Sequence, residues 1–508
     1  MQSSNKPQSL LAPNKKWGLF FFLVIFLCGL GTRLYDLKDP PLDYAATRQL
    51  RSALIARGKY YQWAENVPEW KREIALKQGR HSMIEPTIME NLVAATYWVV
   101  GGEYVWIARI YSAVFWSLGG IALFLLLKEM VSVDGALIGL IYYLFNPFGL
   151  VASRTFQPDP LMTALIIFSW WTFYRWCQTR TWKWALWTGA AAGSAMLVKS
   201  TAVFFLLGGM GLVILTERSF KETWKDLQVW TIAGLAGLPV LAYHLYGVFV
   251  VGTLGKQFQG RFLPTLLTEA FYYKQILDYQ VTVAGHAVIL IIGLLGFGYF
   301  ISRKSLKFVL GIWLGYLLYC MVFTYHSITH SYYHLPLIPL LAITLSGSIE
   351  FLLSKLRSFN DLLGYFVRFC CLVLVILSVS GGYFLLFSEN LRNEPDFYYQ
   401  VANFVPRESN KIVLSQDYGY RISYYGWIKP KVWLGTEDLV VKQLRGSSLQ
   451  DFTDKFQSYV EGYDYFIITR KQEFRRQQAL YEELHGNYQV HKQGGGYIIF
   501  DLNRPRGD

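Results

Sequence analysis

Long apolar runs recur along the first three-quarters of this chain and constrain its fold more than any other feature. Each covers about 16–24 residues, and about 20 apolar residues in a helix cross a bilayer core of about 30 Å. The chain of 508 residues is 53% hydrophobic and only 16% charged, against about 25% charged residues in an average soluble protein. The sequence therefore predicts a polytopic α-helical membrane protein.

The apolar runs predict about eleven transmembrane helices. The first run is longer than the core of a signal peptide and no small-residue cleavage site follows it, so we expect it to remain as the first span. The predicted spans are residues 17–33, 105–127, 134–152, 160–177, 183–198, 201–216, 228–250, 284–302, 306–325, 333–353 and 367–387.

Basic residues gather in alternate short loops, which sets the expected orientation. Lys15 and Lys16 precede the first span, and Arg175 and Lys183 lie between the fourth and fifth. An excess of Lys and Arg marks cytoplasmic loops. We therefore expect a cytoplasmic N-terminus and an extracytoplasmic C-terminal region. The plasma (bacterial inner) membrane fits these flanks, although an endoplasmic reticulum membrane would give the same pattern.

The net charge of +13 lies entirely in the membrane region, because residues 388–508 carry 16 basic and 16 acidic residues. Cytoplasmic loops account for such an excess, so nucleic-acid binding is disfavoured. The cysteines have neither a disulfide pattern nor zinc-binding spacing. They all fall in or at the end of apolar spans: Cys28, Cys177, Cys320, Cys370 and Cys371.

The chain divides by pattern into two domains. Residues 1–387 form the predicted membrane domain, whose first outer segment, residues 34–104, contains an amphipathic helix over 42–58 and a short apolar helix over 85–100. Residues 388–508 read as a small extracytoplasmic α/β domain. It has expected strands at 411–415, 465–469 and 497–502, expected helices at 396–405 and 474–485, and a glycine hairpin at 494–496 rather than a nucleotide-binding motif.

Asp43 follows the first span, at the predicted outer mouth of the bundle. Charges at a membrane boundary are costly and raise a functional question. The structural alternative is a helix N-cap, for which Asp is favoured. Asp43, Leu50 and Arg57 recur at seven-residue spacing, so we expect them to share one helical face on the membrane surface that aims Asp43 toward the bundle.

Further charged residues lie at the outer ends of other spans: Glu85, Arg154, Asp159 and Lys199. We expect them to converge with Asp43 on one outer cavity. Carboxylates with Arg and Lys suit a substrate that carries hydroxyls and a phosphate. The alternatives are a structural ion pair between Arg154 and Asp159, and interfacial snorkelling of Lys199.

Three histidines, His326, His330 and His334, are spaced four residues apart. In a helix they would share one face, and His is a common metal ligand. Pro336 weakens the helical assumption. A divalent metal site, a hydrogen bond to substrate and plain interfacial packing stay open, and we expect no cofactor.

A series of short motifs follows in a fixed order along residues 17–350. They are Asp43 with Gly58, Tyr60 and Tyr61; Glu85-Pro86-Thr87-Ile88; Asp159-Pro160; Val198-Lys199-Ser200; and residues 332–339. With this order the chain resembles the GT-C superfamily of polyprenyl-phosphate-sugar-dependent glycosyltransferases, nearest to the protein O-mannosyltransferase and lipid A aminoarabinose transferase group. Tyr44 replaces the usual motif Glu, and Glu85 replaces a basic or His residue.

The resemblance implies an inverting transfer of sugar from a membrane-embedded polyprenyl phosphate to an acceptor hydroxyl on the outer face. It implies Asp43 as the general base, with Asp159 orienting the acceptor or a cation. Acceptor glycan, lipid or protein is left open. The substrate-binding candidates are Arg57, Tyr60, Tyr61, Glu85, Arg154, Lys199, His330, Tyr332 and Tyr333.

Two other classes of function fit part of the pattern. Charged residues that line a membrane cavity also suit a transporter or flippase of lipid-linked saccharide. The departures at Tyr44 and Glu85 would suit an inactive binding or scaffold protein. Release of free polyprenyl phosphate from a labelled donor distinguishes an enzyme from both.

Overall fold

The computed structural model describes residues 9–82, 84–217, 219–252, 254–255, 261–356, 361–388, 390–439 and 452–505. Its contacts divide the chain into two compact units. We call Met1–Leu37, Ser82–Ile88 and Trp106–Glu389 the helical unit, and Lys38–His81, Met89–Val105 and Asn390–Asp508 the mixed unit. The predicted division assigned residues 34–104 to the membrane domain, whereas the contacts group most of that segment with the C-terminal region.

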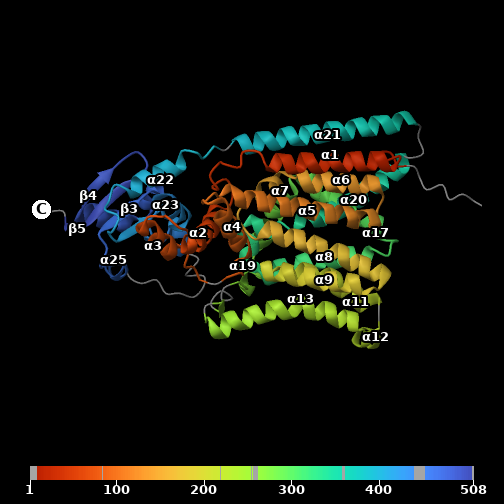
Figure 1. The fold of residues 1–508 in the computed structure, drawn as a ribbon, viewed down its shortest axis with the longest axis horizontal. Helices are drawn as coiled ribbons and strands as arrows, with labels where there is room; N and C mark the ends of the chain where they lie inside the picture. The colour runs from red at the N-terminus through yellow and green to blue at the C-terminus, as the bar shows by residue number, and fades with distance from the viewer. Residues whose placement is uncertain are drawn as a thin grey trace, which may run out of the picture. The chain divides into compact units, whose positions relative to one another are not determined.

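The helical unit consists of apolar helices that run side by side (Figure 1). Its elements are α1 (Lys15–Arg33), α5 (Trp106–Met130), α6 (Val133–Phe145), α7 (Pro147–Ala152), α8 (Asp159–Thr179), α9 (Trp182–Val198), α10 (Ala202–Leu206), η1 (Leu207–Gly211), α11 (Leu212–Glu217), α12 (Phe220–Lys225), α13 (Leu227–Leu245), η2 (Tyr246–Val250), η3 (Pro264–Thr268), α15 (Ala270–Ala284), α16 (Ala287–Leu295), α17 (Phe297–Phe300), α18 (Leu306–Val322), α19 (Thr324–Thr329), η4 (Ser331–His334), α20 (Leu337–Leu356) and α21 (Asp361–Ser388).

Every predicted span lies on one of these helices or on a run of consecutive ones. By length and composition, five of the described helices could cross a membrane, or six if the pair bent by 89° at residues 284–287 is one span. Four shorter apolar helices accompany them: Ile88–Val100, Val133–Phe145, Ala202–Glu217 and Leu306–Val322. The predicted spans therefore coincide with helices, whereas their number, about eleven, stays a prediction.

The mixed unit combines three helices from residues 46–100 with an α/β domain. Its elements are α2 (Ala46–Trp63), α3 (Glu69–Gln78), α4 (Ile88–Val100), α22 (Glu394–Ala402), β1 (Lys411–Leu414), η5 (Gln416–Gly419), α23 (Tyr420–Gly426), β2 (Lys431–Val432), α25 (Phe452–Val460), β3 (Tyr465–Ile468), α26 (Lys471–Arg476), α27 (Gln478–Asn487), β4 (Tyr488–Gln493) and β5 (Ile498–Pro505).

The sheet of the mixed unit has the strand order β2-β1-β3-β5-β4. Strand β1 pairs in parallel with β2 and β3, whereas β5 pairs antiparallel with β3 and β4. All four residues of β1 are buried, as expected for a central strand that is covered on both faces. The predicted strands at 411–415, 465–469 and 497–502 and the glycine hairpin are confirmed, since Gly494 N donates to Tyr497 O at 3.0 Å.

The predicted amphipathic helix of the first outer segment begins later than expected, at Ala46. Its expected apolar face is buried and includes Leu50 and Arg57. Asp43 precedes the helix, so the prediction that it shares this face is wrong. Gly58 serves a different purpose: a Cβ there would lie 2.8 Å from Gly79 Cα, so only glycine permits this close crossing of α2 and α3.

Candidate active site

Asp43 lies in a turn ahead of α2 that the protein holds in a strained conformation. Ala45 is the N-cap residue of α2 and has a left-handed φ of 47°, with no side-chain capping bond. Such a conformation costs a non-glycine residue roughly 1–2 kcal/mol, and strain of this kind gathers at functional sites. The alternative that Asp43 is merely the N-cap is therefore wrong.

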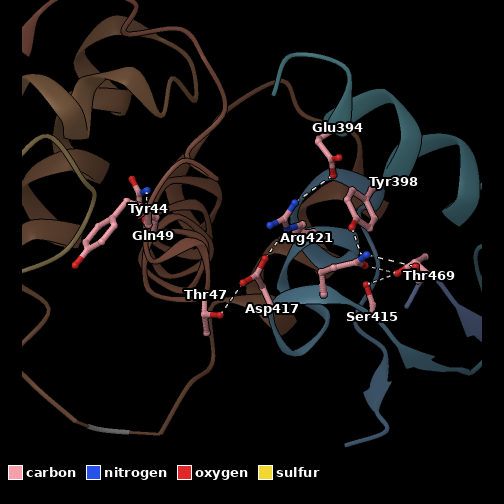
Figure 2. Close-up of polar contacts among 10 residues, drawn as sticks. Tyr44, Thr47, Gln49, Glu394, Tyr398, Ser415, Asp417, Arg421 and Thr469 are labelled. Atoms are coloured by element: carbon pink, nitrogen blue, oxygen red, sulfur yellow. Dashed lines mark hydrogen bonds and ion pairs between the residues drawn. The ribbon is translucent and has the colours of Figure 1, made fainter. Parts of the chain in front are cut away.

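The carboxylate of Asp43 is half-buried and held by its own segment. Its Oδ1 accepts hydrogen bonds from Gln49 Nε2 and from the Tyr44 backbone N–H, both at 3.1 Å. Gln49 is fully buried and also donates to Tyr44 O at 2.7 Å (Figure 2). A buried amide from the first turns of α2 thus fixes both the strained turn and the orientation of the carboxylate.

Arg57, which was predicted to bind substrate, instead contacts other residues of the mixed unit. It is 3% exposed, its Nε lies 3.0 Å from Glu103 Oε1, and its guanidinium stacks between two aromatic rings, 3.9 Å from Tyr424 and 4.0 Å from Trp427. Burial alone would lower the pKa of Arg57, but Glu103 and Tyr424 outweigh burial and raise it. These contacts favour a structural role.

The two tyrosines that follow Gly58 differ in surroundings. The ring of Tyr61 packs on Trp427 at 5.5 Å, and burial raises its pKa to about 12. Tyr60 instead lines a cavity of about 580 Å³, together with Trp63 and Trp98. Of the pair, Tyr60 is the better placed to touch a ligand.

In the helical unit, Asp159 and Lys199 form a buried ion pair. Asp159 is the first residue of α8, and Lys199 is the C-cap of α9. Lys199 Nζ lies 2.7 Å from Asp159 Oδ1, and also 4.1 Å and 5.2 Å from the ring centroids of Tyr333 and Tyr332. Four of the predicted site residues therefore meet in one cluster, held by charge and by cation–π attraction.

Several buried polar atoms around this cluster have no partner within the described part of the chain. Asp159 Oδ2, the Tyr319 hydroxyl and both polar atoms of the Gln157 side chain are buried without a hydrogen bond among the described residues. Buried polar groups in proteins are nearly always paired, with water or a ligand where protein groups are absent. The helical unit therefore holds unmet hydrogen-bonding capacity beside the Asp159–Lys199 pair.

Arg154 is buried, and among the described residues Asp159 pairs with Lys199 and not with Arg154. The alternative of a structural Arg154–Asp159 ion pair is therefore wrong. Arg154 Nη2 donates instead to the backbone oxygen of Asp36 at 2.8 Å. Two arginines that the sequence analysis did not single out lie in the same region: Arg33 donates to Ser153 Oγ at 2.7 Å, and Arg109 to Asp36 O at 3.5 Å. The sequence signal that could have identified Arg33 and Arg109 is a charged residue at the end of an apolar span or just inside it.

The histidine segment is not one helix. His326 lies on α19, His330 has an extended backbone with φ −144°, and His334 lies in η4, so the three do not share a face. His330 is exposed, and the buried His334 is held by the Tyr316 hydroxyl at 2.7 Å and by Ser327 O at 2.8 Å.

No group of three or more His, Cys, Asp or Glu side chains in the described part of the chain could hold a metal ion. A role for the histidines as a metal site is thus unsupported, and the absence of a cofactor stays a prediction. Glu85 is half-buried in the segment just ahead of α4 and remains a candidate.

Comparisons with known proteins agree with this architecture. A family model described as dolichyl-phosphate-mannose-protein mannosyltransferase matches residues 85–246. Among curated protein sequences, none matches the chain.

Several solved structures resemble the chain over nearly its full length. ArnT from Cupriavidus metallidurans, bound to undecaprenyl phosphate, is 14% identical with a TM-score of 0.55, covering 96% of this chain and 98% of its own. The oligosaccharyltransferase AglB from Archaeoglobus fulgidus, in complex with an inhibitory peptide and a dolichol-phosphate, is 12% identical with a TM-score of 0.52, covering 95% of this chain and 74% of its own.

These likenesses show the fold: the chain is a multi-pass helical membrane protein with a small C-terminal α/β region. The family-model match over residues 85–246 and the structural likeness agree with the predicted GT-C-like fold. The predicted fold class is confirmed.

Proposed function

We propose that this protein is an inverting glycosyltransferase that moves a sugar from a polyprenyl-phosphate donor to an acceptor hydroxyl on the outer face of the plasma membrane. The GT-C fold supports the reaction class. The two similar structures hold undecaprenyl phosphate and dolichol-phosphate, and both compounds are polyprenyl phosphates. The donor lipid follows from that shared chemistry.

The main support for the proposal is Asp43, because this residue is not the N-cap of α2 and its half-buried carboxylate is oriented by the buried amide of Gln49. It takes the proton from the acceptor hydroxyl as the oxygen attacks the anomeric carbon. The bond between that carbon and the phosphate oxygen breaks, and the polyprenyl phosphate leaves with the electron pair. Attack opposite the leaving group inverts the anomeric centre, and positioned proton transfer of this kind contributes about 10²–10⁴-fold in rate.

Lys199 is the proposed cation for the leaving phosphate. Charge-assisted hydrogen bonds to a developing phosphate anion lower the barrier most when the donor is fixed beforehand. Asp159 and the rings of Tyr332 and Tyr333 fix the ammonium of Lys199. Asp159 is therefore a positioning residue, and Arg154 is a second cation candidate. Convergence of these groups with Asp43 on one cavity stays a prediction.

The proposal is tested by incubating membranes that contain the protein with a polyprenyl-phosphate sugar labelled in both the lipid and the sugar. We expect free labelled polyprenyl phosphate to appear together with sugar on an acceptor, at an inverted anomeric centre. Movement of intact donor across the membrane without cleavage would contradict the proposal and indicate a flippase.

A further inference from the structure

The mixed unit contains a polar cavity that the proposed chemistry does not use. It has a volume of about 300 Å³, at the lower end of the range for small-molecule sites. Its lining comes from α2, α23, the end of β2 and the segments that follow β1, β2 and β3: Thr47, Ser415, Gln416, Asp417, Tyr418, Arg421, Val432, Trp433, Gly435, Glu437, Asp438 and Arg470.

The topology of the sheet explains why a cavity forms here. The chain leaves β1 toward β2 on one side, and it leaves β3 toward β4 at the opposite edge. Loops that diverge from the carboxyl ends of two adjacent parallel strands open a crevice, and open α/β sheets bind their ligands at this switch point. Ser415 is the first residue after β1 and Arg470 is the second residue after β3, and both line the cavity.

A hydrogen-bonded network fixes the floor of the cavity (Figure 2). Gln416 Oε1 accepts from the Tyr398 hydroxyl at 2.9 Å and from Thr469 Oγ1 at 2.6 Å, and the Thr469 hydroxyl also lies 2.9 Å from Ser415 Oγ. The next residues, Asp417 and Tyr418, have left-handed φ angles of 50° and 54°. The loop after β1 is thus preorganised rather than loosely placed.

The charged groups of the wall fall into two sets. Arg421 is neutralised by an ion pair with Asp417 and by Glu394, whose Oε2 lies 3.2 Å from Arg421 Nη1. The guanidinium of Arg470 has no hydrogen bond or ion pair in the described part of the chain, and Nη1 would lie 3.1 Å from a Cβ at Gly435. The absence of a side chain at Gly435 therefore gives Arg470 access to the cavity.

The wall contains both hydrogen-bond donors and acceptors, with a slight excess of carboxylates from Asp417, Glu437 and Asp438 over the two arginines. An inorganic anion would meet net repulsion from that excess, whereas sugar hydroxyls both donate to carboxylates and accept from guanidinium groups. We propose that this cavity binds one saccharide unit of a neutral glycan.

The cavity is joined to the segment that carries Asp43. Thr47 Oγ1 donates to Asp417 Oδ1 at 3.0 Å (Figure 2), and Thr47 lies four residues after Asp43 in the sequence. Resting on the proposed function, we assign the bound saccharide to the acceptor, so that the mixed unit selects a glycan acceptor by a sugar other than the one that reacts.

Saturation-transfer NMR on the full-length protein in nanodiscs tests the site, with mannobiose, galactobiose and chitobiose as separate probes. We expect a saturation-transfer signal from at least one disaccharide. In Arg470→Ala, we expect the disaccharide to bind about tenfold more weakly, which is the loss expected for a charged hydrogen bond. Arg476→Ala is the matched control, because Arg476 is exposed on α26 outside the cavity. Glu437→Gln, at an exposed lining position, should also weaken binding.

Three results would contradict the proposed saccharide site. They are the absence of a saturation-transfer signal from every disaccharide, equal signals in Arg470→Ala and the wild type, and displacement of the disaccharide by inorganic phosphate. The donor-cleavage assay is independent of this measurement. Disaccharide binding that depends on Arg470, without donor cleavage, would contradict only the proposed function. Donor cleavage, with disaccharide binding that is unchanged in Arg470→Ala, would contradict only the proposed saccharide site.

Discussion

Lys199 Nζ lies 2.7 Å from Asp159 Oδ1, and the side chains of the two residues are only 4% and 0% exposed. Two buried charges this close stabilise one another, whereas either one alone would be strongly unfavourable. This pair links the start of α8 to the end of α9, and it places the ammonium of Lys199 against the tyrosine rings.

Lys199→Ala should therefore destabilise the protein by about 3–5 kcal/mol, because it leaves a buried carboxylate without a partner. The double variant Lys199→Gln with Asp159→Asn should recover most of that stability but not the turnover. Thermal unfolding in detergent measures the first effect and donor cleavage the second. We further expect Lys199→Gln to impair donor use more than acceptor use. Equal impairment of both would indicate a purely structural lysine.

Arg57→Lys should behave as a stability variant rather than a binding variant. Lysine keeps the charge but loses the planar stacking between Tyr424 and Trp427 and the bond to Tyr424 O. We expect a lower unfolding midpoint and an unchanged KM for the donor. A raised donor KM at an unchanged midpoint would instead restore Arg57 to the substrate site.

Gly58→Ala tests the close crossing of α2 and α3. The added Cβ would lie 2.8 Å from Gly79 Cα and 3.0 Å from Ala75 O, both backbone atoms, so we expect a loss of about 1–3 kcal/mol. Gly486→Ala is the matched control, since Gly486 also lies in a helix but meets nothing within 4 Å. That change should be neutral or stabilising by about 0.5–1 kcal/mol. Similar effects of both variants would refute the steric account.

Hydropathy located the apolar helices well because a span must be apolar over its whole length, whatever its neighbours are. The same reasoning missed strands β2 and β4. β2 has two residues, and β4 is exposed along most of its length, so neither carries an alternating apolar pattern. Contacts between segments far apart in the sequence could not be predicted either. Sequence spacing grouped Arg57 with Asp43, whereas in the structure Arg57 contacts Glu103 and Tyr424.

The candidate site was predictable where a charge interrupts an apolar run, as at Asp159 and Lys199. Their pairing with one another, rather than Asp159 with Arg154, depends on how α8 and α9 pack. The expectation that the three histidines share one helical face was wrong for a local reason. The helix ends at Thr329, and His330 has an extended backbone. Spacing alone cannot reveal such a break.

His81 should make the stability of the protein depend on pH. Burial lowers its pKa from 6.5 to about 4, and the neighbouring charges of Arg51 and Lys429 act in the same direction. The unfolded chain therefore binds the proton first, so stability falls as the pH drops from 6.5 toward 4.

At about 1.4 kcal/mol for each unit of pKa displacement, and with partial exposure screening part of the effect, we expect a loss of roughly 1–2 kcal/mol. Denaturant unfolding of the wild type and His81→Gln across this pH window measures it. The variant should show the shallower decline, and parallel pH profiles would contradict the assignment.

Donor cleavage by Asp43→Asn tests the central claim most directly. Asparagine keeps the size of the side chain and its hydrogen-bond acceptor but cannot take the proton. We expect release of polyprenyl phosphate to fall by at least about 10²-fold, with the elution profile and unfolding midpoint unchanged. Asp396→Asn, at an exposed position on α22, should retain full turnover. Wild-type turnover in the folded Asp43→Asn protein would contradict the account.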